Sequence, residues 1–276
     1  MNMKITKFIL TIAIIGMAIS CNKEEEKAST SEELKANAQM DVISDDVSKI
    51  VEDQYDAQFA ASGKTSVVID TFLPSCATVS VLLTETTWTR TVTFDECTLP
   101  NGNVLNGQII ATGSLNFDTP SYVINYSFVD FYHNDILIEG NRTVTRTMAS
   151  TTALAAVHPV ATMDINMTAT FPSGLEVTRV GTRVREMIEG FDTPLNWIDN
   201  IFSITGNWVT TFPSGTRTST ISTPLRIRMN CGNIVRGVID VVGPFGTASI
   251  NFGDGTCDNL AVLTINGTET TITIGN

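Results

Sequence analysis

Histidine is scarce in this sequence, which has only His133 and His158 among its 276 residues. Neither has neighbours that suggest a Ser-His-Asp triad, and no nucleophile elbow, HExxH, Walker or dinucleotide-binding pattern occurs. We expect His133 in a hairpin turn and His158 in a surface loop. The sequence therefore predicts no catalytic site and no cofactor.

Lysine is absent after Lys64, so every positively charged side chain beyond it is an arginine. The whole chain has 29 acidic against 17 basic residues and a formal net charge of −12. Nucleic acids and anionic lipid surfaces are poor partners for such a chain. The 42% hydrophobic content excludes general disorder and predicts a packed core.

Long hydrophobic runs are also missing. The one apolar run, from Phe8 to Ile19, follows Lys4 and Lys7 and is too short to cross a bilayer as a helix. A basic start before such a run is typical of a secretory signal peptide. We therefore exclude residues 1–20 from the predicted fold.

The residues after this run carry a second signal. Ser20-Cys21 resembles the lipobox of bacterial lipoproteins, which implies acylation of Cys21 and membrane binding by roughly 0.8 kcal/mol per buried methylene. An ordinary cleaved signal with an incidental cysteine is the alternative. Residues 23–26, Lys-Glu-Glu-Glu, resemble the export signal of Bacteroidota lipoproteins, which implies an outer-membrane location facing the cell exterior. A solvated tether also explains this charge run.

Cysteine usage predicts disulfides. Beyond Cys21 four cysteines remain, an even number in an exported chain. Sequence separation favours the pairs Cys76 with Cys97 and Cys231 with Cys257, each worth roughly 3 to 4 kcal/mol in the chain-entropy model. A zinc site is disfavoured because the chain has no CxxC and no histidine near these cysteines.

The N-terminal part of the mature chain reads as a tether and a helix. Residues 22–40 are polar and predict a flexible segment. In residues 41–62 the apolar positions recur at three- and four-residue spacings, which predicts an amphipathic helix whose apolar side packs on a sheet. Its acidic residues are expected to face water: Asp45, Asp46, Glu52, Asp53 and Asp56.

Residues 65–276 predict an all-β domain. The segment is rich in threonine and β-branched residues, and apolar residues alternate with period two, as in 122–128. Proline and glycine mark hairpin tips at 99–102, 171–174 and 212–215. A large antiparallel β-meander follows, with two similar halves as one arrangement. An elongated twisted sheet, a sandwich and a barrel all remain open.

The end of the chain carries a family resemblance. Residues 252–259, Phe-Gly-Asp-Gly-Thr-Cys-Asp-Asn, and the strand pattern at 261–267 resemble the ending of a group of uncharacterised Bacteroidota outer-membrane lipoproteins. The resemblance spans roughly residues 65–276. It implies an architecture and an address, and it implies no activity.

Arginines provide the main binding hypothesis. Arg183 and Arg185 share one strand face by period two, and so do Arg226 and Arg228. If the two strands were neighbours, the four guanidinium groups would form a patch suited to the carboxylates or sulfates of an acidic glycan. The alternative is ordinary cross-strand pairing with acidic residues such as Glu176, Glu186 or Asp240.

Two weaker hypotheses concern acidic residues. Asp254, Asp258 and Asn259 offer oxygen ligands for calcium, although an Asp-Gly turn capped by Asn explains them equally. A second group has paired carboxylates beside an aromatic ring, as glycoside hydrolysis requires. It consists of Glu186, Glu189, Asp192, Trp197 and Asp199.

The function expected from these features is that of a surface-exposed, lipid-anchored outer-membrane lipoprotein. It would act as a non-catalytic binding, adhesion or envelope-structural module, with the membrane as one partner and an acidic glycan or an outer-membrane protein as another. One alternative is an extracellular hydrolase acting on polysaccharide. Another is an accessory subunit of an outer-membrane complex, which would expose a sizeable apolar patch.

Overall fold

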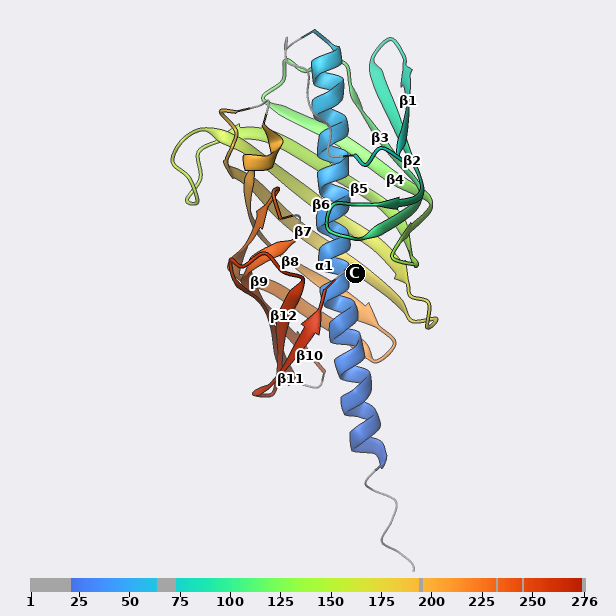
Figure 1. The fold of residues 1–276 in the computed structure, drawn as a ribbon, viewed down its shortest axis with the longest axis vertical. Helices are drawn as coiled ribbons and strands as arrows, with labels where there is room; N and C mark the ends of the chain where they lie inside the picture. The colour runs from blue at the N-terminus through green and yellow to red at the C-terminus, as the bar shows by residue number, and fades with distance from the viewer. Residues whose placement is uncertain (1–20, 64–72, 194–195, 232, 245, 275–276) are drawn as a thin grey trace, which may run out of the picture.

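A computed structural model describes residues 21–63, 73–193, 196–231, 233–244 and 246–274, with side chains from Glu32 onward except that of Trp197. The predicted signal peptide, residues 1–20, lies outside the described residues. The described chain forms one long helix, a short 3₁₀ helix and one sheet (Figure 1). The helices are α1 (Cys21–Ala61) and η1 (Trp197–Asp199).

The strands follow one another along the chain with short connections. They are β1 (Thr78–Leu83), β2 (Thr87–Thr98), β3 (Val104–Ser114), β4 (Ser121–His133), β5 (Ile136–Ala149), β6 (His158–Thr170), β7 (Glu176–Glu189), β8 (Ile201–Phe212), β9 (Gly215–Arg228), β10 (Ile234–Gly243), β11 (Gly246–Asp254), β12 (Leu260–Ile265) and β13 (Thr268–Thr273). Each strand pairs antiparallel with the next, so the sheet order is the sequence order. The predicted β-meander with an N-terminal helix is confirmed.

The sheet is open and strongly curved, and α1 runs along its concave side (Figure 1). Of the three arrangements left open by the sequence, the curved open sheet is therefore the one adopted. Every residue of α1 from Met40 to Glu52 is buried. A helix that is buried all round must be surrounded on all sides, so the inner face of the sheet encloses it.

Alternating side chains decide which strand face packs on the helix. In β4, Tyr122, Ile124 and Tyr126 are buried, while Val123 and Asn125 between them are exposed. This is the period of two of a sheet with one covered face. The predicted turns also form: the Gly102 amide donates to the Leu99 carbonyl at 2.9 Å, and 171–174 closes with the same bond.

The N-terminal prediction needs correction in two respects. The helix begins at Cys21, twenty residues before the expected start, and Leu34, Asn37 and Met40 are buried where a flexible tether was predicted. The sheet supplies partners that this polar segment cannot show by itself. In the part of the chain that the structure describes, no helix is long and apolar enough to cross a membrane.

Both predicted disulfides are present. Cys76 and Cys97 have Cα atoms 5.6 Å apart and join the segment before β1 to the end of β2. Cys231 and Cys257, at 5.7 Å, join the β9–β10 turn to the β11–β12 turn. Each bridge therefore fixes one end region of the meander.

Candidate functional site

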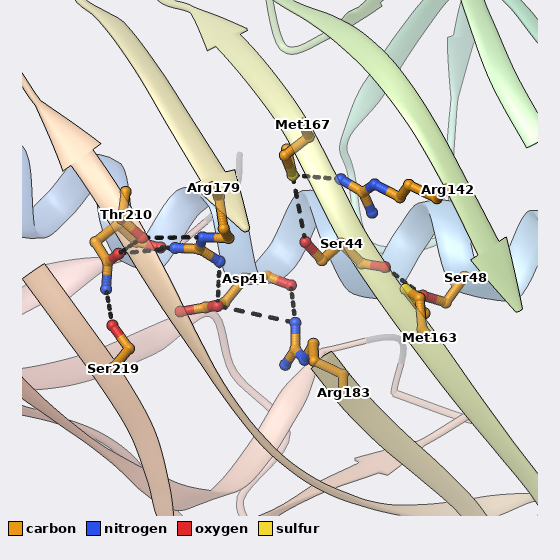
Figure 2. Close-up of polar contacts among 11 residues, drawn as sticks. Asp41, Ser44, Ser48, Arg142, Met163, Met167, Arg179, Arg183, Thr210 and Ser219 are labelled. Atoms are coloured by element: carbon orange, nitrogen blue, oxygen red, sulfur yellow. Dashed lines mark hydrogen bonds and ion pairs between the residues drawn. The ribbon is translucent and has the colours of Figure 1, made fainter. Parts of the chain in front are cut away.

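The acidic side of α1 faces the inner side of the sheet, contrary to the expectation that it faces water. Asp41 is fully buried, and its Oδ1 accepts a hydrogen bond from Arg179 Nη1 at 2.6 Å. Arg183 Nη1 lies 3.8 Å from the same oxygen (Figure 2). The guanidinium carbons of Arg179 and Arg183 lie 4.9 and 5.2 Å from the centre of the Trp208 ring. Both charges are therefore held against an aromatic, apolar surface.

One turn earlier, Asn37 extends this contact. Its carbonyl and side-chain oxygens accept hydrogen bonds from Arg179 Nη2 at 2.9 and 2.8 Å. Thr210 donates to the same side-chain oxygen, and the Asn37 amide donates to Ser219 at 3.3 Å. Residues more than 130 positions apart in sequence therefore share one buried network (Figure 2).

The network continues along the helix in both directions. Glu33 pairs with Arg217, Glu52 with Arg185 at 3.0 Å, and Asp56 with Arg146 at 3.2 Å. Burial raises the pKa of Asp56 to about 6, although the charge of Arg146 opposes this. Glu33, Asn37 and Asp41 lie four residues apart, as do Glu52 and Asp56, and the eleven residues from Asp41 to Glu52 make about three turns. One stripe of α1 therefore lies along a line of arginines on the inner face.

His133 belongs to the same set. It directly precedes the turn of the β4–β5 hairpin, as the sequence predicted, but its side chain is buried rather than at the surface. Its Nε2 lies 2.9 Å from Asp46 Oδ2, which also accepts from Asn103 at 2.7 Å. Burial alone would raise the pKa of Asp46, but the His133 hydrogen bond and the charge of Lys49 outweigh it. The pKa of Asp46 therefore lies below its usual value.

His158 is also buried, at the start of β6, and its prediction as a surface loop residue is wrong. Its Nε2 lies 3.0 Å from Glu186 Oε2, and its Nδ1 lies 2.7 Å from the Ala156 carbonyl. Thr151 donates to the same carboxylate oxygen at 2.5 Å. Both ring nitrogens are therefore engaged by protein groups.

The acidic cluster considered for glycoside hydrolysis does not come together as a carboxylate pair. Glu186 is held by His158 and Thr151, as described above. Asp199 accepts hydrogen bonds from Thr193 at 2.9 Å and from Asn196 at 2.8 Å, which closes a local turn. Glu189 and Asp192 are exposed. The structure therefore gives Glu186 and Asp199 local structural contacts.

The residues considered for calcium form capped turns. Asp254 Oδ1 accepts from the backbone amide and the hydroxyl of Thr256, at 3.1 and 2.9 Å, and the hydroxyl bond lowers the pKa of Asp254. Asp258 accepts from the Leu260 amide at 3.0 Å. Among the described residues, no three or more His, Cys, Asp or Glu side chains are grouped so that they could hold a metal ion.

The four arginines of the binding hypothesis are divided between the two faces. Arg183 and Arg185 point inward and pair with the helix. Arg226 and Arg228 alternate with the buried Leu225 and Ile227 and therefore point outward. No shared patch results. Arg183 and Arg185 are paired with acidic residues, as the alternative interpretation predicted, but these acidic residues lie on α1 rather than on a neighbouring strand.

The outer face instead carries a feature that the sequence analysis missed. Cross-strand pairing links one residue from each strand, from β2 to β13, into an unbroken row, which we call the outer polar row. None of its members is buried. They are Thr89, Thr112, Asn125, Thr143, Asp164, Thr182, Asn207, Thr220, Asp240, Ser249, Thr264 and Glu269.

A hollow with a volume of about 520 Å³ lies at one part of this row. Four consecutive row members line it, from Thr112 to Asp164, together with Ser127, Asn141 and Asn166 of the neighbouring outer positions. The rest of the lining is Ile110, Tyr126 and Arg142, and the Arg142 side chain is only 2% exposed. The pairing between β5 and β6 is interrupted here: it stops after Gly140, which pairs with Met167, and resumes at Thr143, which pairs with Asp164. Amide, hydroxyl and carboxylate groups therefore converge on an open surface. No single strand reveals this row. Successive members are 9 to 25 positions apart in the sequence, except that Thr264 and Glu269 at the last hairpin are 5 apart.

Exposed apolar side chains gather at the first strand. All six residues of β1 are exposed, including Val79, Val81, Leu82 and Leu83, and β1 pairs only with β2 among the described strands.

The chain matches no protein-family model, no curated protein and no solved structure. The resemblance to Bacteroidota lipoproteins therefore remains a prediction.

Proposed function

We infer that this chain is a lipid-anchored outer-membrane lipoprotein that faces the cell exterior and binds a ligand without catalysing a reaction. The anchor is Cys21, the residue that follows the lipobox-like sequence and opens α1. Because α1 continues from this residue into the middle of the sheet, the anchor and the folded domain share one helix. A ligand-binding sheet would thus be held at the membrane by a rigid connection.

The observation that carries the binding assignment is how the polar groups are divided. The buried histidines and the acidic stripe of α1 make contacts inside the protein. No member of the outer polar row is buried, although Thr89 and Thr112 hydrogen-bond to each other at 3.1 Å and Thr143 donates to Asn125 at 3.1 Å. Exposed polar groups arranged on a rigid scaffold favour binding, whereas a hydrolase needs a positioned acid and base.

The anchor is tested by metabolic labelling with an alkyne-tagged palmitate in cells that make the full-length chain or Cys21→Ser. We expect label on the full-length protein and none on the variant, which should appear in the soluble fraction. Surface exposure is tested by protease treatment of intact cells, with a periplasmic protein as the control. A Cys21→Ser protein that stays labelled, or a full-length protein protected from protease, would contradict the proposal.

A further inference from the structure

The composition of the outer polar row follows the strand order. From β4 to β10 the row reads Asn125, Thr143, Asp164, Thr182, Asn207, Thr220 and Asp240. Within this part of the row asparagine or aspartate occurs on the even-numbered strands and threonine on the odd-numbered ones, whereas β2 and β12 carry Thr89 and Thr264. Threonine is common on exposed strands, but Asn and Asp are disfavoured in strand interiors. Their regular recurrence is not what folding alone would select.

The alternation of residue types from strand to strand sets a repeat distance across the sheet. Neighbouring strands lie about 4.8 Å apart at the backbone, so two strands give a repeat of about 10 Å, which is a minimum for side chains on the convex outer face. A disaccharide unit of an extended β-1,4-linked polysaccharide has a similar length. A chain lying across the strands would therefore meet an Asn or Asp side chain once per disaccharide and a threonine hydroxyl between them.

The charge of the outer polar row indicates which class of polysaccharide it can bind. The row contains no Lys or Arg, and Asp164, Asp240 and Glu269 make it negative. The whole protein is also acidic, with a net charge of −12. An anionic chain would be repelled, whereas amide, hydroxyl and carboxylate groups all form hydrogen bonds with neutral sugar hydroxyls. The ligand indicated by the row is therefore uncharged and rich in hydroxyl groups.

The surroundings of the row also suit a sugar chain. Val180 and Val209 are opposite each other on the next outer positions of β7 and β8, and they are 57% and 43% exposed. They offer apolar contact for the C–H faces of sugar rings beside the hydrogen-bonding groups. The hollow between Thr112 and Asp164 gives one part of the row a recessed subsite.

We propose that the outer polar row binds a linear, neutral, β-1,4-linked polysaccharide lying across the strands, with the hollow at Asn125 and Asp164 as its deepest subsite. This proposal rests on the proposed binding function and names its ligand class. Many similar contacts repeat along the row, so affinity depends on the length of the saccharide. The curved, disulfide-braced sheet holds the contact groups in place before binding, which limits the entropy lost on association.

The test uses the full-length protein in detergent and isothermal titration with cellohexaose, mannohexaose and xylohexaose. Hexagalacturonate supplies the anionic arm and maltohexaose the non-extended arm. We expect at least one β-1,4-linked hexaose to bind, about tenfold or more tighter than its disaccharide, and both other arms to bind more weakly. No binding by the three neutral β-1,4-linked hexaoses, or preferential binding of hexagalacturonate or maltohexaose, would overturn the proposal.

Position is tested with variants of exposed side chains. Asn125→Ala, Asp164→Ala and Asn207→Ala should each weaken the best hexaose by about 3- to 10-fold, as expected for one lost hydrogen bond. Thr211→Ala is the matched control, because Thr211 lies on the same outer face of β8 as Asn207 but outside the row. Equal affinities for Asn207→Ala and Thr211→Ala would show that the row is not the site. Palmitate labelling of Cys21 is independent of these titrations, so the anchor proposal can stand or fall separately.

Discussion

At the scale of single residues, the notable property of this protein is charge in its interior. Asp41, Asp46 and Arg179 are each fully buried, and each has partners of opposite charge or several hydrogen bonds. Removing a single partner from a buried ion pair costs about 3 to 5 kcal/mol, whereas replacing the whole pair by apolar groups is often neutral. These residues therefore set the register of the helix more than they add net stability.

The Asp41–Arg179 pair provides a direct test of this view. Arg179→Met should lower the free energy of unfolding by about 3 to 5 kcal/mol, because it leaves Asp41 buried without its closest cation. Asp41→Leu combined with Arg179→Met should recover much of this loss. Urea denaturation of the two single variants and the double variant measures the coupling. Additive losses would contradict the interpretation, as would a double variant that is less stable than either single one.

Asp46 predicts a pH effect. Its lowered pKa means that the folded state favours the charged carboxylate, so its contribution is present above the ordinary aspartate pKa near 4 and lost as the pH falls below it. Asp46→Asn should cost about 3 kcal/mol at pH 7 and clearly less at pH 3. Urea midpoints of both proteins at the two pH values test this. A difference that is independent of pH would exclude the assigned role.

At the scale of elements, the helix is central, because the sheet has its core on the face that encloses α1. Residues 33–40 appear in the sequence as a polar continuation of a tether. In the structure Leu34 and Met40 pack in the core, and Glu33 and Asn37 meet Arg217 and Arg179. Residues 33–40 of the helix are thus part of the fold.

A truncation distinguishes the two interpretations. A chain that begins at Asp41 should be less stable than one that begins at Glu32 by at least about 3 kcal/mol, since it loses the buried Leu34 and Met40 side chains and the Asn37 hydrogen bonds. Thermal and urea unfolding of the two chains measure the difference. Equal stability would mean that residues 32–40 act as a tether after all.

At the scale of the whole molecule, the thirteen strands of the described residues follow sequence order in one long sheet, and among these strands β1 and β13 form its edges. Curvature around α1 makes one core from this sheet, and the disulfides brace its two end regions. The outer polar row crosses strands β2 to β13, so its geometry depends on the integrity of the whole sheet. Ligand binding by the row, as proposed above, would therefore be linked to global stability.

The second disulfide tests how much such a brace contributes to the stability of the sheet. The pair Cys231→Ser and Cys257→Ser should lower the free energy of unfolding by roughly 3 to 4 kcal/mol, because it frees a loop with a sequence separation of 26. Thermal unfolding with and without reductant measures the effect. Reductant should move the parent protein toward the variant and should shift the variant by a smaller amount, owing to the first disulfide. An unchanged midpoint in the variant would show that the strands alone hold this end of the sheet.

The sequence by itself determined the β-meander, its turns and both disulfides, because these depend on local signals: period-two alternation, Pro and Gly at hairpin tips, and the spacing of cysteines. The period-two alternation of β7 can also be followed in the sequence, and it places Arg179, Arg183 and Arg185 on the same strand face as the buried Val177. Only the tertiary structure decided where charge lies. The acidic side of α1 and the arginines of β7 are polar in isolation, and burial becomes favourable only when the curved sheet brings them together. The outer polar row has the same origin, since its members meet through strand register and not through proximity in the chain.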